Sequence, residues 1–238
     1  MRAGSKPSTS MVNEIDAEDF FVNLLKEKKD VLHVAFSSGL SGTYNCLKRV
    51  AEKLNETNEN KIYVVDSKNG SVGEGMVVEY AVKLRNEGKS IEENVQILND
   101  EMFNFNSYFT VQDLKYLVAG GRISKTAAVI GNVLQIKPII YASEEGKVVP
   151  CGKAIGEKKA LLTLVEKVKK LYDEKYEKIY VCHSDNEESA TFILNKVKAH
   201  YPNADVKLGE IGAVMGSHCG PGTVAIFFKG KSRTLEAQ

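Results

Sequence analysis

The sequence predicts an α/β protein with two domains, and three observations lead to this class. Short apolar runs alternate with amphipathic helical segments along the 238 residues. The first half follows a strand, helix, strand, helix order, which is typical of a parallel, Rossmann-like sheet. The second half contains two strands joined by a turn at Glu144–Gly146, followed by strands between two long helices. For this half we expect a mixed or antiparallel sheet with helices packed on it.

The expected elements follow from the spacing of apolar residues. The clearest strands are the short apolar runs Val31–Phe36, Lys61–Val65, Ile136–Tyr141, Ile179–His183, Val206–Ile211 and Thr223–Phe228. Helices are expected near Ala17–Leu25, Tyr44–Leu54 and Gly75–Arg85. Two further helices are indicated by apolar residues at steps of three and four, first Ile91, Val95, Leu98, Met102 and Phe105, then Leu161, Leu164, Val168 and Leu171.

The polar segment Asn86–Ser90 separates two helical stripes and contains Gly88, a residue type that stops helices. We place the domain boundary there, so that residues 1–88 form the first domain and residues 89–238 the second.

Composition narrows the classes of function. The 32 basic and 31 acidic residues give a net charge of +1, which argues against nucleic acid or a membrane surface as the partner. No apolar run approaches the ~18–20 residues that span a bilayer. The four cysteines are scattered without a C-x-x-C pair, and no apolar signal segment begins the chain, so a reduced, cytoplasmic protein is expected. A small neutral or singly charged ligand is favoured.

The segment "FSSGLSGTY", Phe36–Tyr44, lies between a predicted strand and a predicted helix. A nucleophile elbow needs G-x-S-x-G, and Thr43 stands where the second glycine belongs. A phosphate loop needs a lysine after its last glycine, and no lysine follows Gly42. Ser41 is well placed as the N-cap of the helix, whose free N–H groups and dipole favour an anion. Ser41 either helps to bind that anion or only caps its helix.

The loop "DSKNGSVGEG", Asp66–Gly75, follows the next strand. Because adjacent parallel strands place their C-terminal loops side by side, this loop is expected to line the same cleft, unless it is an ordinary connection. Gly73-x-Gly75 without a third glycine is a weak dinucleotide signal, so no nucleotide cofactor is expected.

Two motifs of the second half carry further candidates. Gly120-Gly121 ends one helix and holds Arg122 on a short tether before Ser124, so Arg122 is either an anion-binding residue or a surface partner of an acid. The following helix, Ala127–Leu134, is apolar on several sides, as in a core helix or the wall of an apolar ligand slot.

The second motif places His218 and Cys219 before Gly220–Gly222. We expect His218 to form hydrogen bonds in a cleft, the alternative being a structural histidine. Adjacent Cys-His pairs here and at Cys182-His183 lack zinc-ligand spacing, so no metal site is expected.

Together these segments resemble the DegV family of bacterial fatty-acid-binding proteins. The resemblance covers almost the whole chain in family order and rests on "TSMVN" (Thr9–Asn13), "SSGLSGTY" (Ser37–Tyr44), "DSKNGSVGEG", "YLVAGGRISK" with "IGNVLQIKPI", and "HCGPG". It implies a long-chain fatty acid held in a tunnel between two α/β domains. It also implies a partner kinase that converts the acid to its acyl phosphate with ATP, for phospholipid synthesis, so the chain itself is not an enzyme.

Carried over by motif, the resemblance implies that Thr9 and Ser41 bind the carboxylate of the fatty acid. Arg122 and His218 are linked with the carboxylate end of the tunnel and with kinase-dependent phosphorylation. The same motifs supply further candidates for lining the cleft, namely Ser10, Ser38, Gly42, Thr43 and Ser67.

The chain departs from the family pattern at two places. Ile155 stands where family members commonly carry an arginine after the "IKPI" hairpin. In the family, a strand ending in Asp-Ser precedes the "TS" motif, so we expect the first domain to be truncated and to lack part of its sheet.

The physical chemistry of a fatty acid fits this interpretation. A tail of ~15 carbons offers roughly 12 kcal/mol at ~0.8 kcal/mol per buried CH₂, which is comparable with the cost of association. Hydroxyls and backbone N–H groups are then needed to form hydrogen bonds with the carboxylate, because burying it without partners is costly. Two alternatives stay open: an acyl hydrolase using Ser41, His218 and Asp66, and a protein-interaction subunit with an empty cleft.

Overall fold

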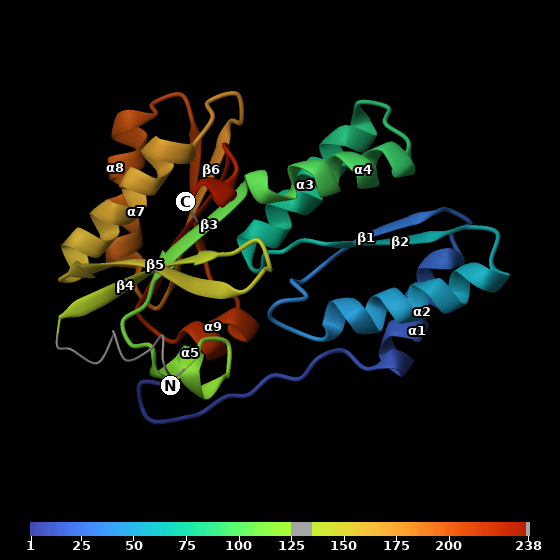
Figure 1. The fold of residues 1–238 in the computed structure, drawn as a ribbon, viewed down its shortest axis with the longest axis horizontal. Helices are drawn as coiled ribbons and strands as arrows, with labels where there is room; N and C mark the ends of the chain where they lie inside the picture. The colour runs from blue at the N-terminus through green and yellow to red at the C-terminus, as the bar shows by residue number, and fades with distance from the viewer. Residues whose placement is uncertain (125–134, 237–238) are drawn as a thin grey trace.

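The computed structural model describes residues 1–124 and 135–236, and within them the strands form two sheets (Figure 1). In the smaller sheet, β1 (Val31–Ala35) pairs in parallel with β2 (Ile62–Asp66). The two strands are joined by α2 (Thr43–Thr57), which packs with α1 (Glu14–Leu25) and both strands around one apolar core. The strand-helix-strand order of the first half is therefore confirmed.

The larger sheet has six strands in the order β5-β4-β3-β8-β6-β7. Of the pairs between its described strands, β6–β7 is parallel and the others are antiparallel, so this sheet is mixed, as expected. β4 and β5 form the predicted hairpin, and all residues of the central strands β3 and β8 are buried. The bounds are β3 (Phe105–Thr110), β4 (Ile136–Ala142), β5 (Val148–Ile155), β6 (Lys178–Ser184), β7 (Asp205–Glu210) and β8 (Thr223–Lys229).

Helices cover both faces of the larger sheet (Figure 1). On one face lie α7 (Glu157–Leu171) and α8 (Glu187–His200). The four apolar residues of the stripe predicted in α7 are all buried, because they pack on the sheet. On the other face, α3 (Val72–Asn86) shares a core with β3 and packs against α4 (Ile91–Glu101). The domain boundary near residue 88 stays a prediction. Helix α3 precedes that boundary in the chain, yet its buried residues belong to a core shared with the larger sheet.

The structure corrects one predicted helix. The stripe that was expected to continue to Phe105 ends with α4 at Glu101, and a short 3-10 turn, η1 (Met102–Asn104), follows. Phe105 instead begins β3, where it pairs with Lys229 of β8. Pairing with β8 fixes this segment as a strand, although the spacing of its apolar residues also fits a helix. The helix expected at 127–134 lies outside the described residues.

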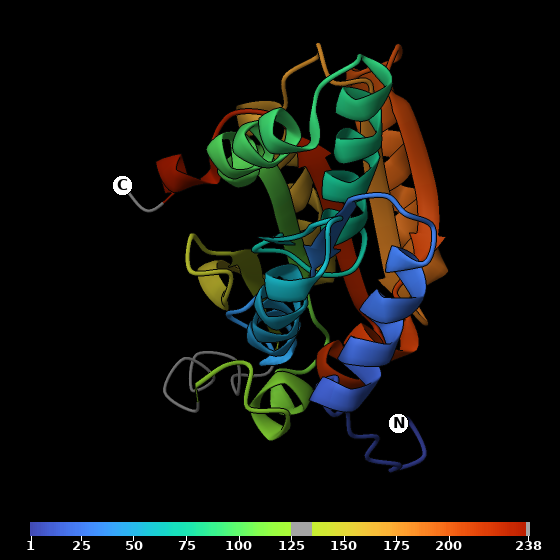
Figure 2. The same cartoon turned by 90° about the vertical axis from the view of Figure 1, so that its right-hand side faces the viewer.

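Two short helices lie together below the sheets, α5 (Lys115–Ala119) and α9 (Ala213–Cys219) (Figure 1). The segment that precedes α1 runs from that helix to α5 and α9, so it lies along both halves of the molecule (Figures 1 and 2). A side-chain bond from Arg2 to Asp185 holds its start. The chain closes with η3 (Arg233–Glu236). In the described part of the chain, no helix has the length and apolarity to cross a bilayer.

Candidate functional site

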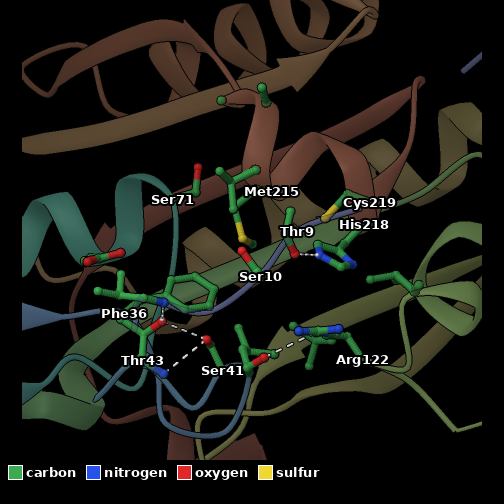
Figure 3. Close-up of a pocket in the computed structure, with 18 residues that line it drawn as sticks. Thr9, Ser10, Phe36, Ser41, Thr43, Ser71, Arg122, Met215, His218 and Cys219 are labelled. Carbon is green, nitrogen blue, oxygen red and sulfur yellow. Dashed lines mark hydrogen bonds between the residues drawn. The ribbon is translucent and has the colours of Figure 1, made fainter. Parts of the chain in front are cut away.

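A cavity of about 510 Å³ lies where the N-terminal segment, the start of α2, α5 and α9 meet. Six residues expected from the sequence line it, namely Thr9, Ser10, Ser41, Thr43, Arg122 and His218. In Figure 3, Thr9, Arg122 and His218 lie on one side of the view, and Phe36 and Ser71 on the other. The remaining wall is mostly apolar and includes Val12, Leu40, Leu117, Val148, Val214 and Met215. The cavity thus combines a small polar cluster with a long apolar surface.

The loop before α2 presents Ser41 to the cavity. The N-cap of α2 is Gly42 rather than Ser41, because the first helical bond runs from the N–H of Cys46 to the carbonyl of Gly42, 3.0 Å away. The hydroxyl of Ser41 still accepts the N–H of Thr43 at 3.2 Å and lies 3.0 Å from the Thr43 hydroxyl. Two neighbouring hydroxyls therefore stand at the start of the helix, where an anion is favoured.

His218, on α9, is held beside the N-terminal segment. Its Nε2 lies 2.7 Å from the hydroxyl oxygen of Thr9. Burial lowers the pKa of His218, and the positive charge of Arg122 lowers it further, so the imidazole is neutral at neutral pH. Gly120 makes this position possible, because a Cβ there would collide with the imidazole ring. The double glycine after α5 thus has a packing role besides ending the helix.

Arg122 connects α5 with the loop of "FSSGLSGTY". Its Nε donates to the carbonyl of Leu40 at 3.2 Å, and its guanidinium also donates to the carbonyl of Gly120. Gly121, at φ +71°, provides the left-handed turn that brings Arg122 back toward this loop. The guanidinium is therefore held by backbone at the cavity wall. Within residues 1–124 and 135–236 it is not paired with an acid, the alternative that the sequence left open.

Three expected cleft residues do not line the cavity. The hydroxyl of Ser38 accepts from Nζ of Lys68 at 3.1 Å. Ser67 is fully buried and donates to the carbonyl of Asn69, which shapes the loop after β2. Gly42 packs against the sulfur of Met11. These residues support the loops whose other side chains reach the cavity.

The structure adds two polar residues that the sequence had not singled out, Ser71 and Glu74. Both belong to "DSKNGSVGEG", the loop that was expected to line the cleft, and Glu74 stands in the first turn of α3. Burial raises the pKa of Glu74 to about 7. In the sequence, Glu74 was recognisable only as an acidic residue inside a glycine-rich loop. Such residues are common on protein surfaces, so this signal is weak.

A second, outer cavity of about 730 Å³ adjoins the first. Thr9, Arg122 and His218 line both cavities, and the outer one is bordered by residues 1–8, α5 and α9. Its wall carries the basic side chains of Lys6 and Lys115. A group bound at the polar cluster is thus flanked by an apolar cavity on one side and a basic cavity on the other.

The catalytic arrangement of a hydrolase is not assembled. Asp66 forms an ion pair with Lys68 at 2.9 Å and accepts the N–H of Ser38. Within the described part of the chain, the hydroxyl of Ser41 bonds with Thr43, and His218 bonds with Thr9, so neither contacts the other. A nucleophile needs its base within hydrogen-bond reach, and Ser41 lacks one. Over residues 1–124 and 135–236, no three His, Cys, Asp or Glu side chains are grouped as metal ligands.

Comparison with known proteins agrees with the fold and the motifs. The model of the DegV family, described as a family of uncharacterised proteins, matches residues 1–231. A DegV domain-containing protein of Clostridium perfringens is 38% identical over 235 residues, which are 98% of this chain and 81% of that protein.

Two solved structures are similar to this chain. A fatty acid binding DegV family protein from Streptococcus agalactiae is 30% identical with a TM-score of 0.85, over 97% of this chain and 81% of that one. A DegV family protein from Eubacterium eligens, loaded with heptadecanoic acid, is 26% identical with a TM-score of 0.83, over 97% and 83%. By the extent and order of these matches, the protein belongs to the DegV family.

Proposed function

We propose that the protein binds a long-chain fatty acid in the 510 Å³ cavity and presents its carboxylate to a partner kinase, which forms the acyl phosphate from ATP. The observation that carries this proposal is the position of Thr9, Arg122 and His218 between two cavities. A carboxylate at this cluster has its tail in the apolar cavity, while its oxygens face the outer one. The relatives that bind fatty acids support the choice of ligand.

The residues have separate roles in this proposal. The hydroxyls of Thr9 and Ser41 donate hydrogen bonds to the carboxylate, and the start of α2 adds its partial positive charge. Arg122 provides a fixed positive charge next to the head group. His218, neutral and bonded to Thr9, orients that hydroxyl. The apolar wall supplies affinity, at about 0.8 kcal/mol for each CH₂ that it removes from water.

Binding needs no cofactor in this scheme, because the phosphoryl donor is bound by the kinase. The basic side chains of Lys6 and Lys115 border the outer cavity, where the transferred phosphoryl group would arrive. In the described part of the chain the four cysteines form no disulfide, which fits a reducing cytoplasm that supplies ATP.

Two measurements test the proposal. Lipid is extracted from the purified protein and identified by mass spectrometry, and a fatty acid near one per chain is expected. The loaded protein is then incubated with ATP and candidate kinases, and acyl phosphate is trapped with hydroxylamine as the hydroxamate. A protein that neither carries nor takes up any fatty acid contradicts the proposal. Release of the alcohol from a chromogenic ester, dependent on Ser41, would favour the hydrolase instead.

A further inference from the structure

The carboxyl group of Glu74 lies in the wall of the lipid cavity without a charged partner. Glu74 is half-buried in the first turn of α3, three residues after Ser71, which also lines the cavity. Among the described residues it has neither an ion pair nor a hydrogen bond, and burial is the single cause of its raised pKa. An acid in this position is unusual in a cavity that is otherwise suited to an apolar chain.

The other titratable groups of the cavity do not neutralise Glu74. Arg122 is held by the carbonyls of Leu40 and Gly120. The imidazole of His218 is neutral at neutral pH, and burial raises the pKa of the Cys219 thiol to about 12, so it carries no charge.

Among the described residues, the elements that pack on α3 do not supply Glu74 with a cation either. Lys178 of β6 is paired with another acid of α3, Glu79. Lys229 of β8 is paired with Glu101 of α4 and does not line the cavity. His33 of β1 packs against the rings of Phe20 and Phe21, and burial lowers its pKa, so it too is neutral. The six residues of β3, Phe105–Thr110, include no acid, base or histidine.

We infer that Glu74 couples fatty-acid binding to proton uptake: its carboxylate takes one proton from solvent when the cavity fills, and the protein therefore holds its ligand less tightly as the pH rises. This inference rests on the proposed function. An acyl chain displaces the water that solvates the carboxylate, and the ligand adds a second negative charge to the same cavity. Both changes favour the protonated, uncharged form of the Glu74 side chain.

The direction of the pH effect follows from linkage. In the free protein the pKa of Glu74 is already about 7, so this group is largely neutral near pH 6 and largely ionised near pH 8. In the complex its pKa is higher still. Affinity is therefore full below pH 7 and falls above it, by about tenfold between about pH 6 and about pH 8.

The experiment uses the delipidated protein of 238 residues and palmitate, titrated by calorimetry across this pH range. Measurements at about pH 8 in two buffers of different ionisation enthalpy count the protons taken up on binding. Wild type is compared with Glu74→Gln, which keeps the shape and removes the titration. The matched control is Glu87→Gln, which removes a charge from the exposed end of the same helix.

We expect wild type and Glu87→Gln to take up nearly one proton at about pH 8 and to lose about tenfold in affinity from about pH 6. Glu74→Gln should take up none and bind palmitate with the same affinity throughout. If wild type binds palmitate but takes up no proton, or if Glu74→Gln keeps the wild-type pH dependence, the inference is wrong and lipid binding stands. If wild type binds palmitate at no pH, the proposed function fails as well. If the variant does not fold, a wild-type count of zero protons still overturns the inference.

Discussion

The hydroxyl oxygen of Thr9 and Nε2 of His218 lie 2.7 Å apart, although 209 residues separate them in the chain. The contact joins the N-terminal segment to α9 at the polar end of the cavity, where the outer cavity adjoins it. Because His218 is neutral, Thr9 and His218 share a hydrogen bond between uncharged groups. A neutral imidazole that donates through Nε2 leaves the O–H of Thr9 able to donate to an anion, and a hydrogen bond to a charged carboxylate is the stronger kind. The polar end is therefore suited to a ligand that accepts from Thr9 while His218 keeps its bond to the same oxygen.

Removing the hydroxyls at the polar end is expected to weaken fatty-acid binding. Ser41→Ala and Thr9→Val should each raise the Kd for palmitate about tenfold, because a hydrogen bond to a charged group contributes about 1.5–3 kcal/mol. The control is Ser38→Ala, in the same loop but outside the cavity, which should leave the Kd within about twofold. Equal effects of Ser38→Ala and Ser41→Ala would show that the loop matters and the Ser41 hydroxyl does not.

Arg122 and His218 are expected to affect phosphorylation more than lipid retention. Arg122→Ala and His218→Gln should lower acyl hydroxamate formation at least about tenfold with a partner kinase, since both side chains line the outer cavity through which the phosphoryl group would arrive under the proposed function. Bound lipid, measured by mass spectrometry, should fall much less. Arg122→Lys keeps the charge but loses the fork that bonds two carbonyls, so partial activity is expected. Wild-type turnover by both variants would exclude these residues from phosphorylation.

His218 is expected to lower the stability of the protein in acid. Its pKa is below the ordinary 6.5 in the folded state, so the unfolded chain binds more protons as the pH falls below about 6.5. From about pH 7 to about pH 5, His218 therefore lowers the free energy of unfolding, while Glu74, whose pKa burial raises to about 7, acts in the opposite sense. His218→Gln should remove the contribution of His218, so the free energy of unfolding of the variant should fall less, or rise more, than that of wild type over this range. His33, whose pKa burial also lowers, acts in the same sense as His218 in both proteins. Urea unfolding at each pH measures the effect, and an identical pH dependence in wild type and variant contradicts it.

Gly220, in the turn after α9, is expected to be intolerant of a side chain. Its φ is +80°, and a Cβ would overlap the ring of Tyr116 of α5. Gly220→Ala should cost more than about 2 kcal/mol of stability and also weaken lipid binding, because α5 and α9 would have to separate. The control, Gly75→Ala, places a methyl group in open space on α3 and should stabilise by about 0.5–1 kcal/mol. Thermal unfolding distinguishes the two, and equal stability of both variants would contradict the expected overlap.

Most of the elements could be predicted from the sequence, because each pattern depends on residues within a single segment of the chain. The stripe of α7 and the hairpin of β4 and β5 needed only the spacing of apolar residues and one turn. The same rules failed at Phe105, where apolar spacing is compatible with a helix and pairing with Lys229 of β8 decides for a strand. The motifs also identified Ser41 as a residue at the start of α2. They placed the N-cap at Ser41, one residue too early, because the first helical hydrogen bond is accepted by the carbonyl of Gly42.

The sequence by itself determined the α/β class, the glycine breaks around Arg122 and the hydroxyl-rich start of α2, because these depend on residues close together in the chain. Only the tertiary structure decided which of these residues share a cavity. It brought Thr9 to His218, left Ser38 and Ser67 outside, and added Glu74. The physical reason is that burial and pairing depend on distant segments, and a carboxyl group such as that of Glu74 changes its pKa only once other elements exclude water from it.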